Sequence, residues 1–279
     1  MGIQWYPGHM TKARRELGEW MPSQDVIIEV LDARMPAASE NPVVAEIRGD
    51  RPCIKVLSKS DLADPAITKR WVSAFNAKKN VIAIEQIADR RSPARVKIPE
   101  LCKKLAPHRI GPHKHVRAMI VGIPNVGKST LINALMDRKV AKVGDEPAVT
   151  KARQFVTLAN GMLLWDSPGI LWPNIEDETV ALRLAFCGSI PDSAMDYETV
   201  AMYGADYLLK HYADAVCARY KLKSAPESAS ALLDEIGKRR GALRMGGVID
   251  RHKAADALIH DFRSGAIGRI SLEAPRSVD

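Results

Sequence analysis

The stretch GIPNVGKST at residues 122–130 limits the fold more than any other part of the sequence. It matches the pattern G-x-x-x-x-G-K-[ST], follows the apolar run RAMIVG and opens the helix-like run STLINALM. The glycines let backbone N–H groups turn onto phosphate oxygens, and the start of a helix adds partial positive charge. The pattern therefore predicts a phosphate-binding loop between a strand and a helix. Such a loop usually lies near the start of its domain, whereas here 121 residues precede it.

The side chains after the glycines carry the chemistry of this loop. Lys128 is expected to reach the β- and γ-phosphates of a nucleotide, and the Ser129 hydroxyl is expected to bind Mg²⁺. A glycine-rich turn without a ligand is the alternative, but the flanking strand and helix favour the nucleotide loop. We expect nucleotide contacts from Asn125, Val126, Gly127, Lys128, Ser129 and Thr130.

A second pattern, D-S-P-G at residues 166–169, ends the apolar run MLLWD. In a D-x-x-G pattern the Asp holds Mg²⁺ through water, and the N–H of the glycine, here Gly169, can touch the γ-phosphate. Thr150 lies between the two patterns, where a switch loop would offer a hydroxyl to Mg²⁺; an ordinary loop threonine is the alternative. The predicted Mg²⁺ ligands are Ser129, Thr150 and Asp166.

A site for GTP also needs a group that reads the base, and no such pattern follows Gly169. The stretch SKSD at 58–61 follows the apolar run CIKVL and is close to the N-K-x-D of GTPases. There the Asp accepts hydrogen bonds from guanine N1 and N2, and the Lys packs along the base. The run VIAIEQ (81–86) falls where a further loop near guanine is expected. We predict that Ser58, Lys59 and Asp61 form the part of the site that recognises the nucleotide base.

The base reader therefore precedes the P-loop, in the reverse of the usual order. Packing rather than chain order fixes which strands are neighbours, so cutting one loop and joining the old termini can leave a site intact. The basic stretch at 106–117 would then be the segment that connects the two halves of the permuted domain. The order of motifs predicts a circularly permuted GTPase domain.

Strand-like runs alternate with helix-like segments in the first part of the chain, which predicts a mostly parallel sheet flanked by helices. After about residue 178 the apolar spacing is helical. The fold class is therefore α/β with a smaller all-α domain, the domains being 1–177 and 178–279 with 169–177 as the connector. We expect strands within 25–36, 51–62, 80–85 and 115–122, a hairpin over 153–166, and helices at 64–80, 92–108 (interrupted at Pro99) and 128–137.

Composition narrows the class of protein. The chain of 279 residues is 46% hydrophobic and 27% charged, typical of a soluble globular protein, and no apolar run approaches the roughly 20 residues of a membrane span. The N-terminus has no signal or transit pattern, and the four cysteines form no C-x-x-C pair, so we expect a cytoplasmic protein with reduced thiols. A net charge of +8 fits either a solvated surface or contact with nucleic acid.

The motifs together resemble the circularly permuted GTPases of the YlqF/RbgA type, the ribosome biogenesis GTPase A family, over nearly the whole chain. The resemblance rests on WYPGHMTKA (5–13), LDARMP (31–36), GIPNVGKST, DSPGILWP (166–173) and DFRSGAIGRISLE (261–273). It implies an assembly factor for the large ribosomal subunit that binds GTP, GDP and Mg²⁺. It also implies that the C-terminal helical domain contacts ribosomal RNA, with no membrane partner and a monomer away from the ribosome.

Two positions depart from the family pattern. Ser58 replaces the Asn that usually braces the base loop against the P-loop, so we expect a weaker brace and lower nucleotide affinity. Ala148 stands where a Gly commonly precedes the switch threonine, which affects the expected mobility of that loop.

The catalytic group is not obvious from the motifs. Ile170 follows D-x-x-G where Ras-like enzymes have the Gln that orients water, so we expect slow intrinsic hydrolysis that the ribosome stimulates. His9 in PGHM is our candidate for the missing polar group, beside Lys128 and Thr150, with a surface or RNA-contacting histidine as the alternative. Asn125 is either a K⁺ ligand beside the phosphates, as in potassium-stimulated GTPases, or a loop brace.

The charged residues outside the nucleotide motifs can have either a structural or a functional role. Asp32 and Arg34 in DARMP are expected to form an ion pair or loop anchor rather than to be catalytic. The basic clusters are either solvated surface or phosphate-backbone contacts to structured RNA. The RNA-binding candidates are Lys12, Arg14, Arg15, Lys238, Arg239, Arg240, Arg244, Arg263 and Arg269.

Three functions remain open from the sequence. The leading hypothesis is a GTPase switch that binds a precursor of the large ribosomal subunit with GTP and leaves after hydrolysis. The alternative is an RNA-binding assembly factor that keeps GTP as a structural ligand with negligible turnover. An ATPase or kinase is disfavoured by Asp61.

Overall fold

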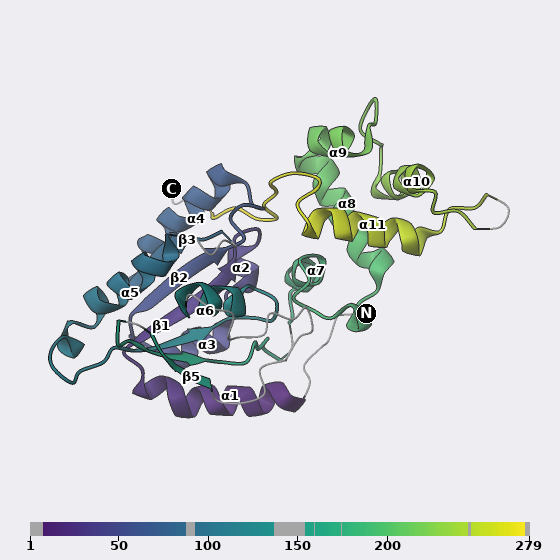
Figure 1. The fold of residues 1–279 in the computed structure, drawn as a ribbon. Coiled ribbons are helices and arrows are strands. Elements are labelled where there is room, and N and C mark those ends of the chain that lie inside the picture. The colour runs from purple at the N-terminus through teal and green to yellow at the C-terminus, as the bar shows by residue number, and fades with distance from the viewer. Residues whose placement is uncertain are drawn as a thin grey trace. The chain divides into compact units, whose positions relative to one another are not determined.

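The structure is a computed structural model of the chain, and it describes residues 8–87, 93–136, 154–158, 160–173, 175–244 and 247–276. The chain forms two compact units. An α/β unit comprises Tyr6–Asn174 together with the segment that starts at Glu273, and a helical unit comprises Ile175–Leu272. The chain therefore leaves the α/β unit before Ile175 and rejoins it after Leu272 (Figure 1).

The α/β unit is built on a six-stranded sheet with the order β3-β2-β1-β4-β6-β5. β1, β2, β3, β4 and β6 pair in parallel, and β5 pairs antiparallel with β6 as the predicted hairpin. β1 and β2 are buried along their whole length, as expected for central strands of a parallel sheet with helices on both faces. The strands are β1 (Val26–Asp32), β2 (Cys53–Ser58), β3 (Val81–Glu85), β4 (Arg117–Val121), β5 (Gln154–Thr157) and β6 (Leu163–Asp166).

The strand order confirms the circular permutation. β4, which leads into the P-loop, lies between β1 and β6 although β1 comes 91 residues earlier in the chain. Reading from β4 through β6 and then on to β1, β2 and β3 gives the order in which the P-loop comes first. Because parallel strands end at the same edge, the ends of β4, β6 and β2 bring the three predicted motifs to one edge of the sheet.

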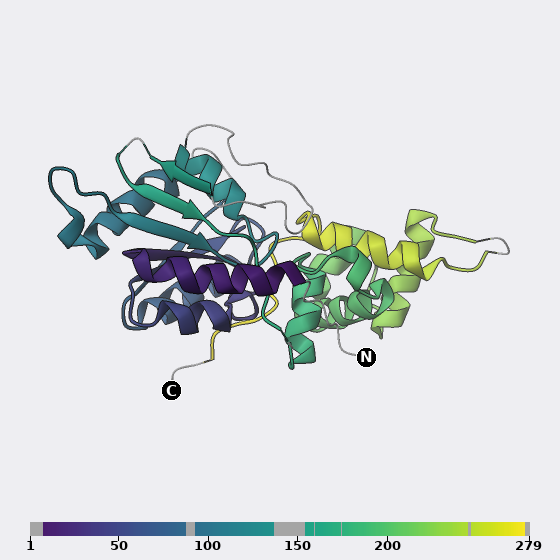
Figure 2. The same ribbon diagram turned by 90° about the horizontal axis from the view of Figure 1, so that it is seen from below.

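Helices cover both faces of the sheet (Figure 2). On one face, Ala13, Leu17 and Met21 pack with Ile27 and other core residues, and Phe75 packs beside β2 and β3. The helices are α1 (Gly8–Trp20), α2 (Pro36–Ser39), α3 (Pro42–Arg48), α4 (Pro65–Asn76), α5 (Ala94–Leu105) and α6 (Lys128–Met136).

The expected helices are confirmed, with one correction. Asp64 caps α4 as predicted, because its carboxylate accepts hydrogen bonds from the N–H groups of Ala66 and Ile67. The predicted interruption at Pro99 is wrong, because α5 continues through this residue. Proline removes one intrahelical hydrogen bond, and the burial of Ile98 and Cys102 on either side holds the helix together.

The helical unit contains α7 (Glu178–Phe186), α8 (Tyr197–His211), α9 (Ala213–Tyr220), α10 (Ala229–Arg240) and α11 (Arg251–Arg263). Side chains of Asp177, Asp196, Ser228 and Asp250 cap the N-termini of α7, α8, α10 and α11. The rings of Phe186 and Phe262 stack with their centroids 4.1 Å apart. In the part of the chain that the structure describes, no helix is long and apolar enough to cross a membrane.

Candidate functional site

The P-loop makes a tight turn between β4 and α6. Gly122 has φ 151°, and a Cβ there would lie 2.6 Å from the Val30 carbonyl oxygen, so no other residue fits. Asn125 and Gly127 also have positive φ, of 55° and 103°. The loop backbone is therefore shaped in advance for close approach to a ligand.

Lys128 and Asp166 lie at the centre of the phosphate end of the site. Lys128 Nζ donates hydrogen bonds to the carbonyl oxygens of Gly122 (3.0 Å) and Ile123 (2.8 Å). Burial lowers the pKa of Lys128 to about 8, against the influence of Asp166. Burial also raises the pKa of Asp166 to about 6, although the positive charge of Lys128 opposes this. Both side chains lie in a low-dielectric site, where desolvation makes the charged form of each less favourable than it is in water.

The same site fits a divalent cation. Asp166 Oδ1 is buried and has no hydrogen-bond partner among the described residues. A buried carboxylate oxygen without a partner is unfavourable unless a ligand completes it. Ser129 is the second residue of α6, and the P-loop pattern assigns its hydroxyl to the same cation. The donor set of one carboxylate and one hydroxyl is the oxygen chemistry that Mg²⁺ prefers.

The D-x-x-G segment lies directly against the P-loop. A Cβ on Gly169 would lie 2.8 Å from Lys128 Nζ and 3.0 Å from Pro124 Cα. A side chain at this position would displace the lysine or the loop backbone. The two phosphate motifs, which are separated in the sequence, therefore form one surface.

Ile170 points away from this surface. It is 2% exposed and joins the core cluster that contains Ala13 and Leu17 of α1. Its carbonyl oxygen accepts a hydrogen bond of 2.9 Å from the side chain of Asn41. Burial in the core agrees with the prediction that Ile170 does not orient water, and it fastens the segment after Gly169 to α1.

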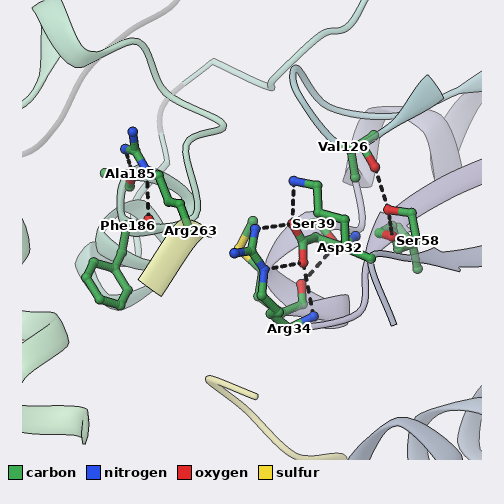
Figure 3. Close-up of polar contacts among 11 residues, drawn as sticks. Asp32, Arg34, Ser39, Ser58, Val126, Ala185, Phe186 and Arg263 are labelled. Carbon is green, nitrogen blue, oxygen red and sulfur yellow. Dashed lines mark hydrogen bonds and ion pairs between the residues drawn. The ribbon is translucent and has the colours of Figure 1, made fainter. Parts of the chain in front are cut away.

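The base-reading loop is joined to the P-loop by Ser58. Its Oγ lies 2.9 Å from the Leu31 carbonyl oxygen and within hydrogen-bond distance of the Val126 carbonyl oxygen (Figure 3). The brace that we expected Ser58 to weaken is therefore present, because a hydroxyl on a short side chain reaches the P-loop backbone. The backbone N–H of Ser60 donates to the Gln86 carbonyl oxygen, which ties the loop to the end of β3.

Lys59 is held by Asp32 from the neighbouring strand. Its Nζ lies 3.0 Å from Asp32 Oδ2, and Arg34 donates to both oxygens of the same carboxylate at 2.9 and 2.8 Å (Figure 3). Burial alone would raise the pKa of Asp32, but the charges of Arg34 and Lys59 outweigh it and hold this pKa well below its usual range. The predicted ion pair between Asp32 and Arg34 is confirmed, and it includes a residue of the base-reading loop.

The remaining predicted residues fall into two groups. Asp61 is exposed in the loop after β2. Thr150 and Ala148 lie outside the described residues, and of His9 only the backbone, in the first turn of α1, is described.

Some of the predicted RNA contacts have structural partners. Arg263 donates to the carbonyl oxygens of Phe186 (3.1 Å) and Ala185 (2.8 Å), so it caps the C-terminus of α7 (Figure 3). It also pairs with Asp192 at 3.0 Å. Arg240 pairs with the buried Asp261 at 2.6 Å. Six other basic side chains are at least two-fifths exposed and form ion pairs with exposed or partly exposed carboxylates: Lys12, Arg14, Arg15, Lys238, Arg239 and Arg244.

Sequence reasoning did not find the support for the base loop. Nothing in the local pattern shows that Asp32 would reach Lys59, because Asp32 ends β1 and Lys59 follows β2. Glu273, in the segment after the helical unit, accepts a hydrogen bond from the Ala37 N–H at the start of α2, 236 residues earlier in the chain. Only the strand order of the sheet could have suggested the first of these contacts.

Comparison with known proteins agrees with this geometry. Residues 117–214 match the family model described as "50S ribosome-binding GTPase". The chain is 43% identical to "Ribosome biogenesis GTPase A" of Bacillus cereus, covering 99% of this chain and 95% of that protein. It is 34% identical to the protein of the same name from Thermotoga maritima over 99% of this chain and 96% of the other.

A solved structure shares the fold. The crystal structure of GNP-bound YlqF from T. maritima has a TM-score of 0.68 and 30% sequence identity, with 96% of this chain and all of the other covered. A more distant relative is "Mitochondrial ribosome-associated GTPase 1" of Mus musculus, 32% identical over 97% of this chain and 90% of that protein.

Proposed function

Because the chain belongs to the ribosome biogenesis GTPase A family, we propose that this GTPase is an assembly factor for the large ribosomal subunit in the cytoplasm. It binds the precursor and its RNA in a nucleotide-dependent way and acts as a monomer away from the ribosome. The names of the relatives and the matched family model support the partner. The observation that carries the mechanism is the buried Asp166 oxygen without a partner beside Lys128, because it makes the phosphate end incomplete without its ligands.

The residues of the phosphate end have separate roles in this proposal. Lys128 exchanges its bonds to the P-loop carbonyl oxygens for bonds to the β- and γ-phosphates. Ser129, Asp166 and Thr150 would hold Mg²⁺, which supplies charge neutralisation at the phosphates when it is bound. The N–H of Gly169 would contact the γ-phosphate, which the closeness of Gly169 to Lys128 supports, and the chain continues from this segment into the helical unit.

The base end selects guanine. Asp61 accepts hydrogen bonds from guanine N1 and N2, and the stem of Lys59 packs along the base while Asp32 holds its ammonium group. Ser58 keeps this loop at a fixed distance from the P-loop.

Hydrolysis of GTP with and without large ribosomal subunits tests the proposal. We expect slow turnover by the protein alone and a large increase with the subunit, with the small subunit as the control. Turnover that stays negligible with the subunit, while GTP still supports binding, would favour the alternative of GTP as a structural ligand.

Two further residues are tested within the same assay. His9→Ala should reduce subunit-stimulated turnover without weakening GTP binding, and unchanged turnover removes the catalytic role of His9. Asn125 as a K⁺ ligand predicts faster turnover in KCl than in NaCl; equal rates leave Asn125 as a loop brace.

The exposed basic residues are the proposed RNA contacts, chiefly those that bind neither backbone carbonyl oxygens, as Arg263 does, nor the buried Asp261, as Arg240 does. Contact with RNA phosphates predicts binding that weakens steeply with salt, because each neutralised phosphate releases counterions. Arg244→Ala should therefore reduce the salt dependence, whereas a flat salt response of the wild type would indicate a protein partner.

A further inference from the structure

The chain returns to the α/β unit at Glu273 and makes a helix cap there. Glu273 Oε1 accepts hydrogen bonds from the N–H groups of Ala37 and Ala38, the latter at 3.0 Å. These are first-turn N–H groups of α2, which have no acceptor within the helix. Met35, at the cap position, has no side-chain oxygen to offer, so a carboxylate from the C-terminal segment replaces the usual N-cap residue.

The same segment is fastened to α4. The Trp71 indole Nε1 donates to the Glu273 carbonyl oxygen at 3.2 Å, and Arg70 donates to the Pro275 carbonyl oxygen at 3.2 Å. Both donors lie on α4. The segment therefore joins α2 and α4, which are not joined by a direct hydrogen bond among the described residues.

α2 supports the residue that holds Lys59. The Ser39 hydroxyl, at the end of α2, accepts a hydrogen bond of 3.0 Å from the backbone N–H of Asp32 and donates to the Met35 carbonyl oxygen. Ser39 and Asp32 are fully buried. A shift of α2 would therefore move Asp32, whose carboxylate lies 3.0 Å from Lys59 Nζ.

α4 supports the other end of the same loop. The base-reading loop at 58–62 runs directly into the cap of α4 at Asp64. One end of the loop is thus held through Asp32 by α2, and the other end is held by α4. Glu273 bonds to both helices, one through its carboxylate and one through its carbonyl oxygen.

We propose that Glu273 is a positioning residue for guanine recognition, which fixes the base-reading loop by holding α2 and α4 together. It touches neither base nor phosphate and acts through Asp32 and the start of α4. The inference rests on the proposed assignment of Asp61 to guanine. If the proposal is right, the affinity for guanine depends on the segment that starts at Glu273, directly after the helical unit.

The test compares the affinities of Glu273→Ala and wild type for GDP and IDP. IDP lacks the 2-amino group of guanine, so the ratio of the two affinities reports how well Asp61 is placed. We expect GDP affinity to fall about tenfold, as for the loss of roughly one well-placed hydrogen bond, and the GDP/IDP ratio to fall with it. Glu273→Gln keeps an acceptor oxygen, so its GDP/IDP affinity ratio should be close to that of the wild type.

Matched variants separate positioning from general stability. Glu227→Ala removes an exposed carboxylate of the helical unit and should leave the ratio unchanged. Trp71→Phe keeps an aromatic ring but loses the donor to Glu273, and it should lower the ratio in the same direction. If Glu273→Ala does not fold, Trp71→Phe and Glu273→Gln decide the question.

Asp61→Asn distinguishes the failure of this inference from the failure of the base assignment. If Asp61→Asn leaves the GDP/IDP ratio unchanged, the base assignment is wrong. If Asp61→Asn abolishes the ratio while Glu273→Ala and Trp71→Phe keep it, the base assignment stands and the positioning role is overturned. The positioning role is also overturned if Glu273→Ala loses GDP and IDP affinity equally and has a lower melting temperature. Glu273 would then only stabilise the fold by capping α2.

Discussion

The phosphate end and the base end of the nucleotide site are built in opposite ways. At the phosphate end, glycine backbone approaches so closely that a Cβ does not fit on Gly122 or Gly169, and a buried oxygen of Asp166 has no partner. At the base end the charged side chains are paired: Asp32 takes donors from Arg34 and Lys59, and Ser58 Oγ lies close to two carbonyl oxygens. A buried atom there without a hydrogen-bond partner among the described residues, Gln86 Oε1, belongs to a neutral side chain.

The polar groups of the phosphate end need a bound ligand to satisfy them, whereas the charges of the base end are neutralised by other side chains of the protein. The pKa values at the phosphate end are shifted by burial against the charged forms, whereas the pKa of Asp32 is lowered because its charge is compensated. The phosphate end is therefore destabilised until its ligands bind, and the base end is a stable scaffold. Nucleotide and cation should change the phosphate end most.

The largest effect is expected at the base end, from Asp32→Ala. Removing this carboxylate breaks a buried pair with Arg34, which is 1% exposed, and should cost about 3–5 kcal/mol of unfolding free energy. Since the folded pKa of Asp32 is lowered, its contribution is present above the unfolded value of 3.8 and is lost as the pH falls through the folded pKa. Urea unfolding measures both effects.

The control for this change is Glu46→Ala, which removes the exposed partner of Arg14. Exposed pairs contribute little, so this variant should unfold like the wild type. A small effect of Asp32→Ala would contradict the view of the base end as a scaffold.

Asp166→Asn should act in opposite directions on stability and on turnover. Its folded pKa of about 6 lies above 3.8, so the folded state binds more protons between these values, and the stability due to Asp166 falls as the pH rises through that window. Without ligands at pH 7, the variant should gain up to about 3 kcal/mol, while Mg²⁺-dependent turnover is lost. Unfolding curves at pH 4.5 and 7 and a hydrolysis assay measure this, and a destabilised variant would refute the contrast.

Gly169→Ala should lower kcat/KM for GTP about 100-fold, because the new Cβ would lie 2.8 Å from Lys128 Nζ and displace it by a fraction of an ångström or more. The GDP/IDP ratio should stay unchanged, since the base end is not touched. Gly18→Ala is the matched control, because a Cβ at Gly18 meets nothing within 4 Å. If the base ratio falls as much as turnover, the two ends are not separate.

The smallest effect is expected from Ser58→Ala, which removes the brace between the two ends. Losing the hydroxyl should cost about 1 kcal/mol, or about a fivefold loss of GDP affinity. Ser73→Ala on the exposed face of α4 is the control, and titration with GDP is the measurement. GDP affinity equal to that of the wild type would mean that the contact of Ser58 with Val126 adds nothing to binding.

The sequence predicted the parts of the site that are coded by local patterns. The glycine spacing of the P-loop, the D-x-x-G at a strand end and the SKSD after CIKVL each have a backbone reason for their residue types. Their order along the chain was enough to predict the permutation, which the position of β4 between β1 and β6 confirms.

Contacts between distant parts of the chain could not be predicted in this way. α1 was not expected, although it packs Ala13 and Leu17 against Ile170. The cap on α2 comes from Glu273, where the usual signal is a polar residue directly before the helix. Such contacts depend on which strands become neighbours, and no local propensity contains that information.

The permuted strand order also has a consequence for protein synthesis. A ribosome adds about 5–20 residues per second, so about 5–20 s separate the translation of Asp61 from that of Asp166. Throughout most of that time β1 exposes the edge that β4 later covers, and an exposed edge is open to wrong pairing. The base end is thus made first, yet Glu273, which bonds to α2, is translated only after the whole helical unit. If Glu273 positions the base-reading loop as proposed, the nascent chain gains its full affinity for a nucleotide only after the helical unit has been translated.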